Sequence, residues 1–338
     1  MKELINSIRI FLIYRFYKIG VILERISNKG FALDIFSSSF QNNPYKTYSK
    51  MRTINPIYHS KPTFLRWVTK MDLVQEMIRD DRFSVDDRKF PIAKLRRNEL
   101  RRDGRDIMLD QFENPSILKL DPPDHSRIRK LVSYGFTNRY IKSLETEIND
   151  TINQCLDKTH NLESFDLMNV LAKPLPAIVI AKMMGLPDSD LNQFQIWSEN
   201  LLKEVGGIGS SVKKRKLARD AYEDLIRYFE KIIIERKDNP GDDFIGKLIL
   251  AEEEGDKLNV KEMYGTCLLL LIAGHETTTR LVGNGLFALL NHPDQFELLK
   301  QDHSKIPNAI EEMLRYEPPV HATVRFANDN MTYRNRDY

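Results

Sequence analysis

Cysteine is scarce in this sequence, which has only Cys155 and Cys267 among 338 residues. Two cysteines cannot build a disulfide framework, and these two lack the close spacing of a zinc site. Their scarcity is typical of proteins from a reducing compartment. We therefore expect a cytoplasmic protein.

Long apolar runs are also absent. The longest, Cys267–Gly274, is far shorter than the roughly 20 residues that a membrane-spanning helix needs. Glycine and proline, 15 of each without a period, exclude collagen-like and low-complexity architectures. The net charge of +3 is too small to indicate nucleic-acid binding, so we expect no nucleic-acid partner.

The first 31 residues carry an excess of positive charge. They contain six basic and two acidic residues, interleaved with apolar ones. This pattern predicts an amphipathic helix, which can pack on its own domain or rest peripherally on an anionic membrane surface. Packing is the commoner case, and both alternatives stay open. We expect residues 1–31 to form this segment and residues 32–338 to form one domain.

The rest of the chain predicts a fold that is mainly α with a small β-sheet. Helices are expected over Asn43–Ile54 and Asp72–Arg79, with strands at Pro56–Ser60 and Thr63–Thr69 between them. Phe90–Pro115 has mixed charge and predicts a long loop. Beyond it the apolar period of 3.6 predicts helices almost throughout, until a final strand. The helix breaks and that strand lie at Pro122-Pro123, Pro187-Asp188, Gly206–Ser211, Pro240-Gly241, Pro293, Pro307 and Val320–Ala327.

A chemically unusual segment, residues 273–280, lies inside a predicted buried helix from about Val260 to Asn291. It has the sequence Ala-Gly-His-Glu-Thr-Thr-Thr-Arg. A zinc protease would need a second histidine at position 279, where this chain has threonine. A dinucleotide fingerprint, Gly283-x-Gly285-x-x-Ala288, would have to follow a strand, and here it lies within a helix. Both interpretations are therefore disfavoured.

The third interpretation of this segment is an oxygen-binding groove. Gly274 would let a flat ligand approach the backbone. The Thr277 hydroxyl can bond back to the carbonyl four residues earlier and open the helix. An acid beside an alcohol, Glu276 beside Thr277, can relay protons.

Ala273-Gly274-x-Glu276-Thr277 resembles the oxygen-activation motif of the haem-thiolate monooxygenases, the cytochrome P450 family, and specifically its soluble bacterial members. Four further segments resemble family motifs in the right order. They are Asp80–Ser84, the start of the third helix at Leu120–Arg129, the Glu-x-x-Arg motif at Glu312–Arg315, and the strand at Val320–Ala327.

The resemblance implies a cytochrome P450 fold that binds haem, iron protoporphyrin IX. It makes Glu276 and Thr277 catalytic, and Glu312 and Arg315 a structural ion pair. It also implies that five residues contact haem: His125, Arg129, Ala273, Gly274 and Arg325. Of these, His125 and Arg129 would bind a haem propionate. His125 and Arg129 are spaced i and i+4, so one carboxylate could accept hydrogen bonds from both side chains.

The family's iron ligand is a cysteine in a loop of the type Phe-x-x-Gly-x-His/Arg-x-Cys-x-Gly, downstream of the position of Arg325. Neither Cys155 nor Cys267 has that context, so we assign no metal ligand. The sequence is therefore expected to be a family member that is incomplete at its C-terminus.

For the intact protein the resemblance implies a monooxygenase that inserts one atom of dioxygen into a small organic substrate. Electrons would come from NAD(P)H through a separate ferredoxin or flavodoxin type donor. The alternative is a haem-free remnant that binds a ligand or a protein without catalysis. A basic run, Lys94–Arg105, is either a solvated face or a sign of an acidic or carrier-bound substrate. Arg127, expected to be exposed, and Lys130 could meet an acidic donor, and Gly206–Ser211 is a predicted substrate lid.

Overall fold

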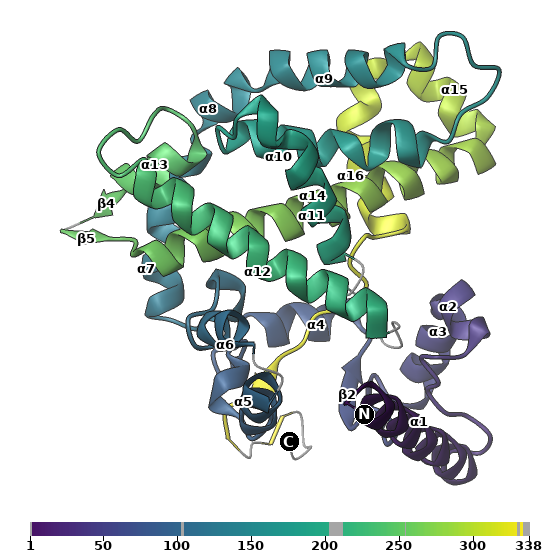
Figure 1. Cartoon of the computed structure of the whole chain (residues 1–338). Coiled ribbons are helices and arrows are strands. Elements are labelled where there is room, and N and C mark those ends of the chain that lie inside the picture. Colours follow the sequence, from purple (N-terminus) through teal and green to yellow (C-terminus); the bar gives the residue numbers. More distant parts are fainter. Residues whose placement is uncertain (1, 103–104, 203–211, 254, 330–331, 334–338) are drawn as a thin grey trace. The chain divides into compact units, whose positions relative to one another are not determined.

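Helices make up most of the chain in the computed structural model, which describes residues 2–102, 105–202, 212–253, 255–329 and 332–333 (Figure 1). The chain divides into two units, residues 1–84 with 325–338, and residues 85–324. None of the described helices combines the length and the apolar content that a bilayer crossing requires. The predicted lid at Gly206–Ser211 lies outside the described residues.

The first unit contains one long helix, three short helices and two antiparallel strand pairs. Its elements are α1 (Lys2–Ser27), α2 (Ser38–Asn42), α3 (Pro44–Ile54), β1 (Ile57–Ser60), β2 (Leu65–Val68), α4 (Met71–Ile78), β3 (Phe83–Ser84) and β6 (Phe326–Ala327). In the β1–β2 hairpin Ile57 pairs with Val68 and Ser60 with Leu65. β3 pairs with β6, so the two separate segments of this unit, residues 1–84 and 325–338, are joined by one strand pair.

Helix α1 packs one face on its own unit. Tyr17, Val21 and Glu24 are buried on it, and the Glu24 carboxylate accepts hydrogen bonds from the backbone N–H of Leu33 (3.1 Å) and of Lys61 (2.8 Å). The Tyr58 hydroxyl donates to the same carboxylate. A buried carboxylate with three donors is satisfied rather than costly. One face of the predicted amphipathic helix is therefore a packing face.

The second unit is helical apart from one small hairpin. Its elements are α5 (Ile92–Arg102), α6 (Asp106–Glu113), α7 (Asp124–Ser133), α8 (Asn138–Ser143), α9 (Glu145–Asp157), α10 (Pro174–Met183), α11 (Leu191–Leu202), α12 (Val212–Glu235), α13 (Phe244–Leu250), β4 (Glu252–Glu253), β5 (Asp256–Lys257), α14 (Val260–Asn291), α15 (Pro293–Gln301) and α16 (Ile306–Tyr316).

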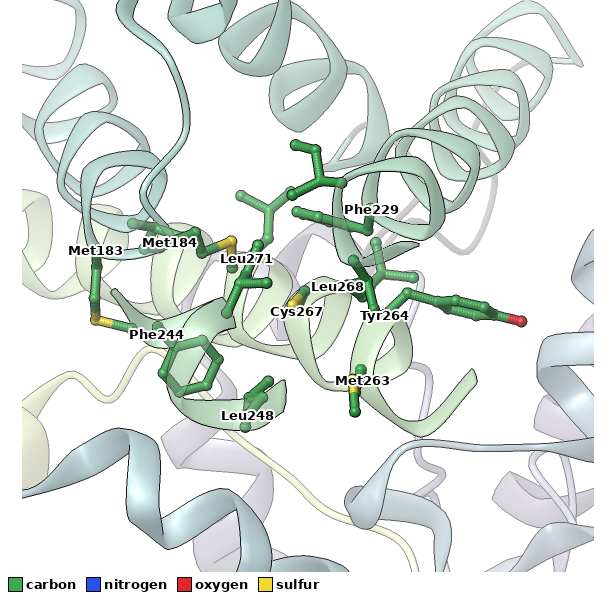
Figure 2. Packing of buried hydrophobic residues seen from close by; sticks show 14 of the residues in the cluster. Met183, Met184, Phe229, Phe244, Leu248, Met263, Tyr264, Cys267, Leu268 and Leu271 are labelled. Atoms are coloured by element: carbon green, nitrogen blue, oxygen red, sulfur yellow. The ribbon is translucent and has the colours of Figure 1, made fainter. Parts of the chain in front are cut away.

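Helix α14 is the centre of this unit and packs against α10, α11, α12, α13 and α16 (Figure 1). Its N-terminus has a capping box, in which the Asn259 side chain accepts from the Glu262 N–H and the Glu262 side chain accepts from the Asn259 N–H. Figure 2 shows its apolar side chains meeting Met183 at the end of α10, Met184 directly after it, Phe229 of α12 and Phe244 of α13. The predicted long buried helix is confirmed, with the expected limits.

Two predictions about local structure are wrong. Phe90–Pro115 contains two helices, α5 and α6, instead of a long loop. The strand predicted over Val320–Ala327 is reduced to Phe326–Ala327, because only those residues find a partner strand, β3. The helices at Asn43–Ile54 and Asp72–Arg79 and the hairpin between them are confirmed to within a residue or two.

Candidate active site

The motif segment of α14 has one open and one buried face. Leu271, His275 and Thr279, spaced four apart, are buried against the rest of the unit. Ala273 is exposed and Thr277 is half-buried on another side of the helix. The open face therefore presents a methyl group and a hydroxyl one turn apart, and small side chains of this kind leave room for a flat ligand.

The Thr277 hydroxyl donates a hydrogen bond to the carbonyl oxygen of Ala273, four residues earlier. This back-bond was predicted and is confirmed. The expected opening of the helix is not found, since α14 is continuous from Val260 to Asn291. Because the hydroxyl proton is used inside the helix, the Thr277 oxygen presents its lone pairs to a neighbour.

Glu276 is held by the next turn of the same helix. Its Oε1 accepts from Nε (2.9 Å) and Nη2 (2.5 Å) of Arg280. The Glu276 side chain is 15% exposed and that of Arg280 is 54% exposed, so the pair lies at the edge of the open face. The carboxylate has an arginine partner, and no hydrogen bond joins it to Thr277 among the described contacts.

The glycines of α14 have packing partners. A Cβ at Gly274 would lie 2.9 Å from Cδ1 of Ile180 on α10, and one at Gly285 would lie 2.5 Å from Sδ of Met313 on α16. Close contact between α14 and α10 therefore requires a small residue at Gly274. That Gly274 also lets a flat ligand approach the backbone stays a prediction. Close helix packing likewise accounts for Gly285 and excludes a phosphate-binding turn there.

His275 was considered in the sequence only as an incomplete zinc pair, and its actual partners were missed. The side chain is buried, its Nδ1 is hydrogen-bonded to the Ser198 hydroxyl on α11, and its Nε2 lies 3.0 Å from the carbonyl oxygen of Lys173. A carbonyl can only accept, so Nε2 carries the proton and Nδ1 accepts from Ser198. Burial lowers the pKa of His275, which favours the neutral form of the imidazole.

His125 and Arg129 lie one turn apart on α7, as predicted. His125 is half-buried and Arg129 is exposed. Within the described ranges neither side chain has a hydrogen-bond or ion-pair partner. Two adjacent donors without an internal acceptor fit a ligand that carries carboxylates.

Arg127 differs from its prediction. Its guanidinium lies 3.3 Å from Asp256 Oδ2 and also donates to Glu262, so its charge is used inside the unit. Arg127 was expected to be exposed and to meet an electron donor, and this is corrected. Carboxylates from two other segments face it, which the local sequence could not show. Lys130 is exposed on the same helix.

The Glu312–Arg315 ion pair forms as predicted, with Arg315 Nε 2.7 Å from Glu312 Oε2 and Nη2 2.5 Å from Oε1. Both side chains are more than half exposed, so the pair contributes little to stability. Arg325 belongs to the first unit and directly precedes β6, with a half-buried side chain.

A cavity of about 460 Å³ runs along α14 on the N-terminal side of the motif. Gly265, Leu268, Leu269 and Ile272 line it, and the same helix face continues to Ala273 and Glu276. The other walls come from the segment before α5, from α5, α6 and α12, and from the segment after α6, with these lining residues: Asp87, Ile92, Ala93, Arg96, Met108, Phe112, Pro115, Ser116, Lys119 and Tyr222.

The basic run at Lys94–Arg105 has several partners. Arg97 Nε lies 2.6 Å from Glu113 Oε1, and this contact lowers the pKa of the Glu113 carboxyl. Arg105 Nη1 lies 3.0 Å from Asp220 and 3.3 Å from Glu223. Arg96 lines the cavity and has no ion-pair partner among the described residues. Ion pairs within the chain therefore neutralise part of the positive charge of this run, whereas the charge of Arg96 is available to a ligand in the cavity.

Both cysteines are buried away from the open face of α14. Cys267 is fully buried in the apolar core, where Figure 2 shows its sulfur among aliphatic and aromatic side chains, and burial raises its pKa. Cys155 is buried on α9. Among the described residues no group of histidine, cysteine or carboxylate side chains is arranged to hold a metal ion.

Comparison with known proteins places these features in one family. The family model for Cytochrome P450 matches residues 92–338, more than half of the chain. The chain belongs to the cytochrome P450 family. Haem binding and monooxygenase chemistry characterise this family, and its fold is the one described above.

Individual relatives agree with this assignment. Cytochrome P450 CYP107DY1 of Priestia megaterium is 36% identical over 78% of this chain, and the match spans 64% of that protein, less than two thirds of its length. The polyketide biosynthesis cytochrome P450 PksS of Bacillus subtilis is 35% identical over 87% of this chain and 72% of its own length.

Solved structures show the same fold. The structure of PksS superposes with a TM-score of 0.76 at 34% identity, covering 90% of this chain and 74% of the other. P450BioI, solved with an acyl carrier protein that carries hexadec-9Z-enoic acid, gives a TM-score of 0.77 at 31% identity, covering 89% and 75%.

Proposed function

We propose that this P450, in its haem-loaded form, is a monooxygenase that hydroxylates a small organic substrate. The observation that carries the proposal is the open face of α14, where Thr277 is bonded back to Ala273. A cavity lies along the same helix on the N-terminal side of this motif. When bound, haem supplies the activation of dioxygen, one atom of which enters the substrate while the other leaves as water.

The residues present fit this group. The unpartnered donors His125 and Arg129 match the carboxylate chemistry of the propionates, and the small side chains of α14 match a flat ring. We propose that His125 and Arg129 bind a propionate and that Ala273 with Gly274 borders the oxygen site. For Arg325, which belongs to the first unit, contact with a haem propionate stays a prediction from the family resemblance. Because Cys155 and Cys267 are both buried elsewhere, we assign no iron ligand within this sequence.

Thr277 and Glu276 have separate tasks in this proposal. The Thr277 oxygen accepts a hydrogen bond from an ordered water, or donates to a ligand oxygen after releasing the Ala273 carbonyl. Glu276 passes protons to that water once its carboxylate turns from Arg280, its partner in this structure. Breaking an ion pair whose arginine is half exposed is inexpensive, so the exchange is accessible.

The substrate of this proposal lies in the cavity along α14. Its walls are mainly apolar, and Arg96 supplies a positive charge without a partner among the described side chains. These features favour an apolar substrate with an acidic group, free or attached to a carrier. P450BioI was solved with such a carrier-bound chain, which supports this class without defining the substrate here.

Electrons in this proposal come from NAD(P)H through a separate ferredoxin or flavodoxin type protein. Arg127 is excluded from that interface because Asp256 and Glu262 already bind it. Exposed basic residues of α7, among them Lys130, are the ones that could face an acidic donor.

Replacing Thr277 with alanine tests the proposed chemistry. In the haem-loaded protein the variant should keep consuming dioxygen and NAD(P)H while releasing much of the reduced oxygen as peroxide, because Thr277 no longer directs protons. Thr278→Ala, an exposed neighbour on the same helix, is the matched control and should behave as the parent. Equal yields of product per NAD(P)H in Thr277→Ala and parent would remove Thr277 from the mechanism.

Replacing Arg96 with glutamine tests the substrate class. Calorimetric titration with a long-chain fatty acid should show at least about tenfold weaker binding to Arg96→Gln, since a charge-assisted contact is lost. The methyl ester of the same acid should bind parent and variant alike. Arg101→Gln, on the exposed side of α5, is the control. Unchanged affinity for the acid would contradict the role of Arg96.

Haem titration separates this function from the haem-free alternative. A chain that acts only as a helical binding module stays colourless when haem is added, whereas the proposed enzyme takes up haem in a saturable way with a sharp Soret band.

A further inference from the structure

Helix α1 has a second apolar face, opposite its packing face. Phe16, Ile19, Ile22, Leu23 and Ile26 are all more than half exposed, with Phe16 at 72% and Ile26 at 75%. At about 100° per residue they fall within one third of the helix circumference, on the side away from Tyr17, Val21 and Glu24. A continuous exposed stripe of this kind marks an interaction surface.

One edge of the stripe is basic. The half-buried Lys18 and the exposed Arg25 lie along this edge, and the exposed Lys29 follows directly after the helix. The exposed Arg15 lies within the stripe itself. The one acidic residue of α1 between residues 14 and 27, Glu24, is buried and fully hydrogen-bonded on the packing face. Lys18 pairs with Asp34 at 2.7 Å, and Arg25 and Lys29 are exposed to solvent.

The other edge of the stripe meets the β1–β2 turn. A Cβ at Gly20 would lie 3.1 Å from Cα of Pro62, and the Lys61 N–H donates to Glu24, so the turn is seated on α1. Phe16 and Leu23 lie one turn before and after Gly20. Phe64, at the tip of this turn, is 89% exposed and has a positive φ of 56°.

A bulky aromatic residue in the left-handed region is strained, and an exposed ring gains no packing energy to offset the strain. Phe64 thus has no folding benefit that the structure can explain. Phe64 lies two residues after Pro62, which packs on Gly20 of α1, so exposed apolar surface continues from the helix onto the turn.

We infer that α1 and the β1–β2 turn dock this protein on an anionic lipid surface, with the stripe and Phe64 in the acyl boundary and the basic edge at the headgroups. An apolar stripe flanked by lysine and arginine is the pattern of helices that lie in the membrane interface. A protein partner would need acidic groups matched to scattered cations, whereas an anionic bilayer offers negative charge everywhere along the edge. The inference is independent of the proposed catalytic function.

The test is sedimentation of the full chain with vesicles of phosphatidylcholine containing about one third phosphatidylglycerol, compared with pure phosphatidylcholine. The parent should bind the anionic vesicles at least about tenfold more tightly, and added salt should weaken that binding. Phe16→Ser and Phe64→Ser, on different elements, should each weaken it about tenfold. Both residues are exposed, so circular dichroism should show unchanged folding.

Phe287→Ser provides the matched control, since Phe287 is 71% exposed on α14 in the other unit and should leave vesicle binding unchanged. Equal binding to both vesicle types, or no effect of both test variants, would overturn the inference. Self-association that both variants abolish, without vesicle binding by the parent, would instead assign the face to a second copy of the chain. A polarity-sensitive dye on Phe64→Cys should shift to the blue only with anionic vesicles, and the buried Cys155 and Cys267 leave that position as the reactive one.

Discussion

Replacing His275 with phenylalanine should destabilise the second unit, because the Ser198 hydroxyl and the Lys173 carbonyl would each lose a hydrogen-bond partner. The Ser198 hydroxyl is buried, and the Lys173 carbonyl is partly buried where His275 meets it. A buried polar group without a hydrogen bond costs about 1–3 kcal/mol. Since the carbonyl retains some access to water, we expect the free energy of unfolding to fall by about 2–4 kcal/mol near pH 7.5.

The same substitution should also remove a pH dependence. Burial lowers the pKa of folded His275 below its ordinary value of 6.5, although the nearby carboxylates Glu199 and Glu276 oppose this. Below pH 6.5 the unfolded chain therefore binds a proton that the folded chain does not, and stability is lost as the pH falls toward the folded pKa. The loss between about pH 7.5 and 5.5 is up to about 1.4 kcal/mol. In His275→Phe that loss is absent, so the difference from the parent should shrink by this amount.

Urea unfolding followed by tryptophan fluorescence measures both effects. The sequence has two tryptophans, so a Trp67→Phe background leaves Trp197, next to Ser198 on α11, as the reporter of this unit. His160→Phe is the control, because His160 is exposed and should change stability by less than about 0.5 kcal/mol at either pH. Parallel stability curves for parent and His275→Phe across this pH range would refute the assignment of a buried neutral imidazole.

Two further predictions concern α7. Replacing both His125 and Arg129 with alanine should lower haem retention while the helicity of the haem-free protein stays unchanged, and parental haem occupancy in the variant would rule out propionate binding. Replacing Arg127 with glutamine should lower the free energy of unfolding by roughly 1 kcal/mol in urea, because Asp256 and Glu262 lose their partner. Arg129→Gln, which breaks no ion pair among the described residues, should leave stability unchanged, and equal losses in the two variants would show that the Arg127 pairs contribute nothing.

Elements that depend on local sequence could be predicted. The limits of α14 follow from a long apolar period that ends before Pro293, and the Thr277 back-bond follows from a spacing of four residues on one helix. The Glu312–Arg315 pair is also local, with a spacing of three. In each case the interacting groups lie within one or two helical turns, so the helix itself brings them together.

Features that depend on distant partners could not be predicted. In the segment expected to be a loop, α5 is rich in charge and buries only Ala93 and Leu100, and it is held by the Arg97 pair with Glu113. The partners of His275 lie 77 and 102 residues away in the sequence. Ile180, which packs on Gly274, is also remote in the sequence, so this contact could not be predicted.

The shared use of Glu262 has a mechanical consequence. This residue closes the capping box at the start of α14 and also binds Arg127 of α7. Arg127 lies between His125 and Arg129 in the sequence but about 160–200° around the helix from them. Its attachment therefore sets the rotation of α7 about its own axis, and with it the direction in which the two free donors point. Fraying of the first turn of α14 would therefore allow α7 to rotate about its axis. That first turn lies far from Thr277, which is on the same helix, α14.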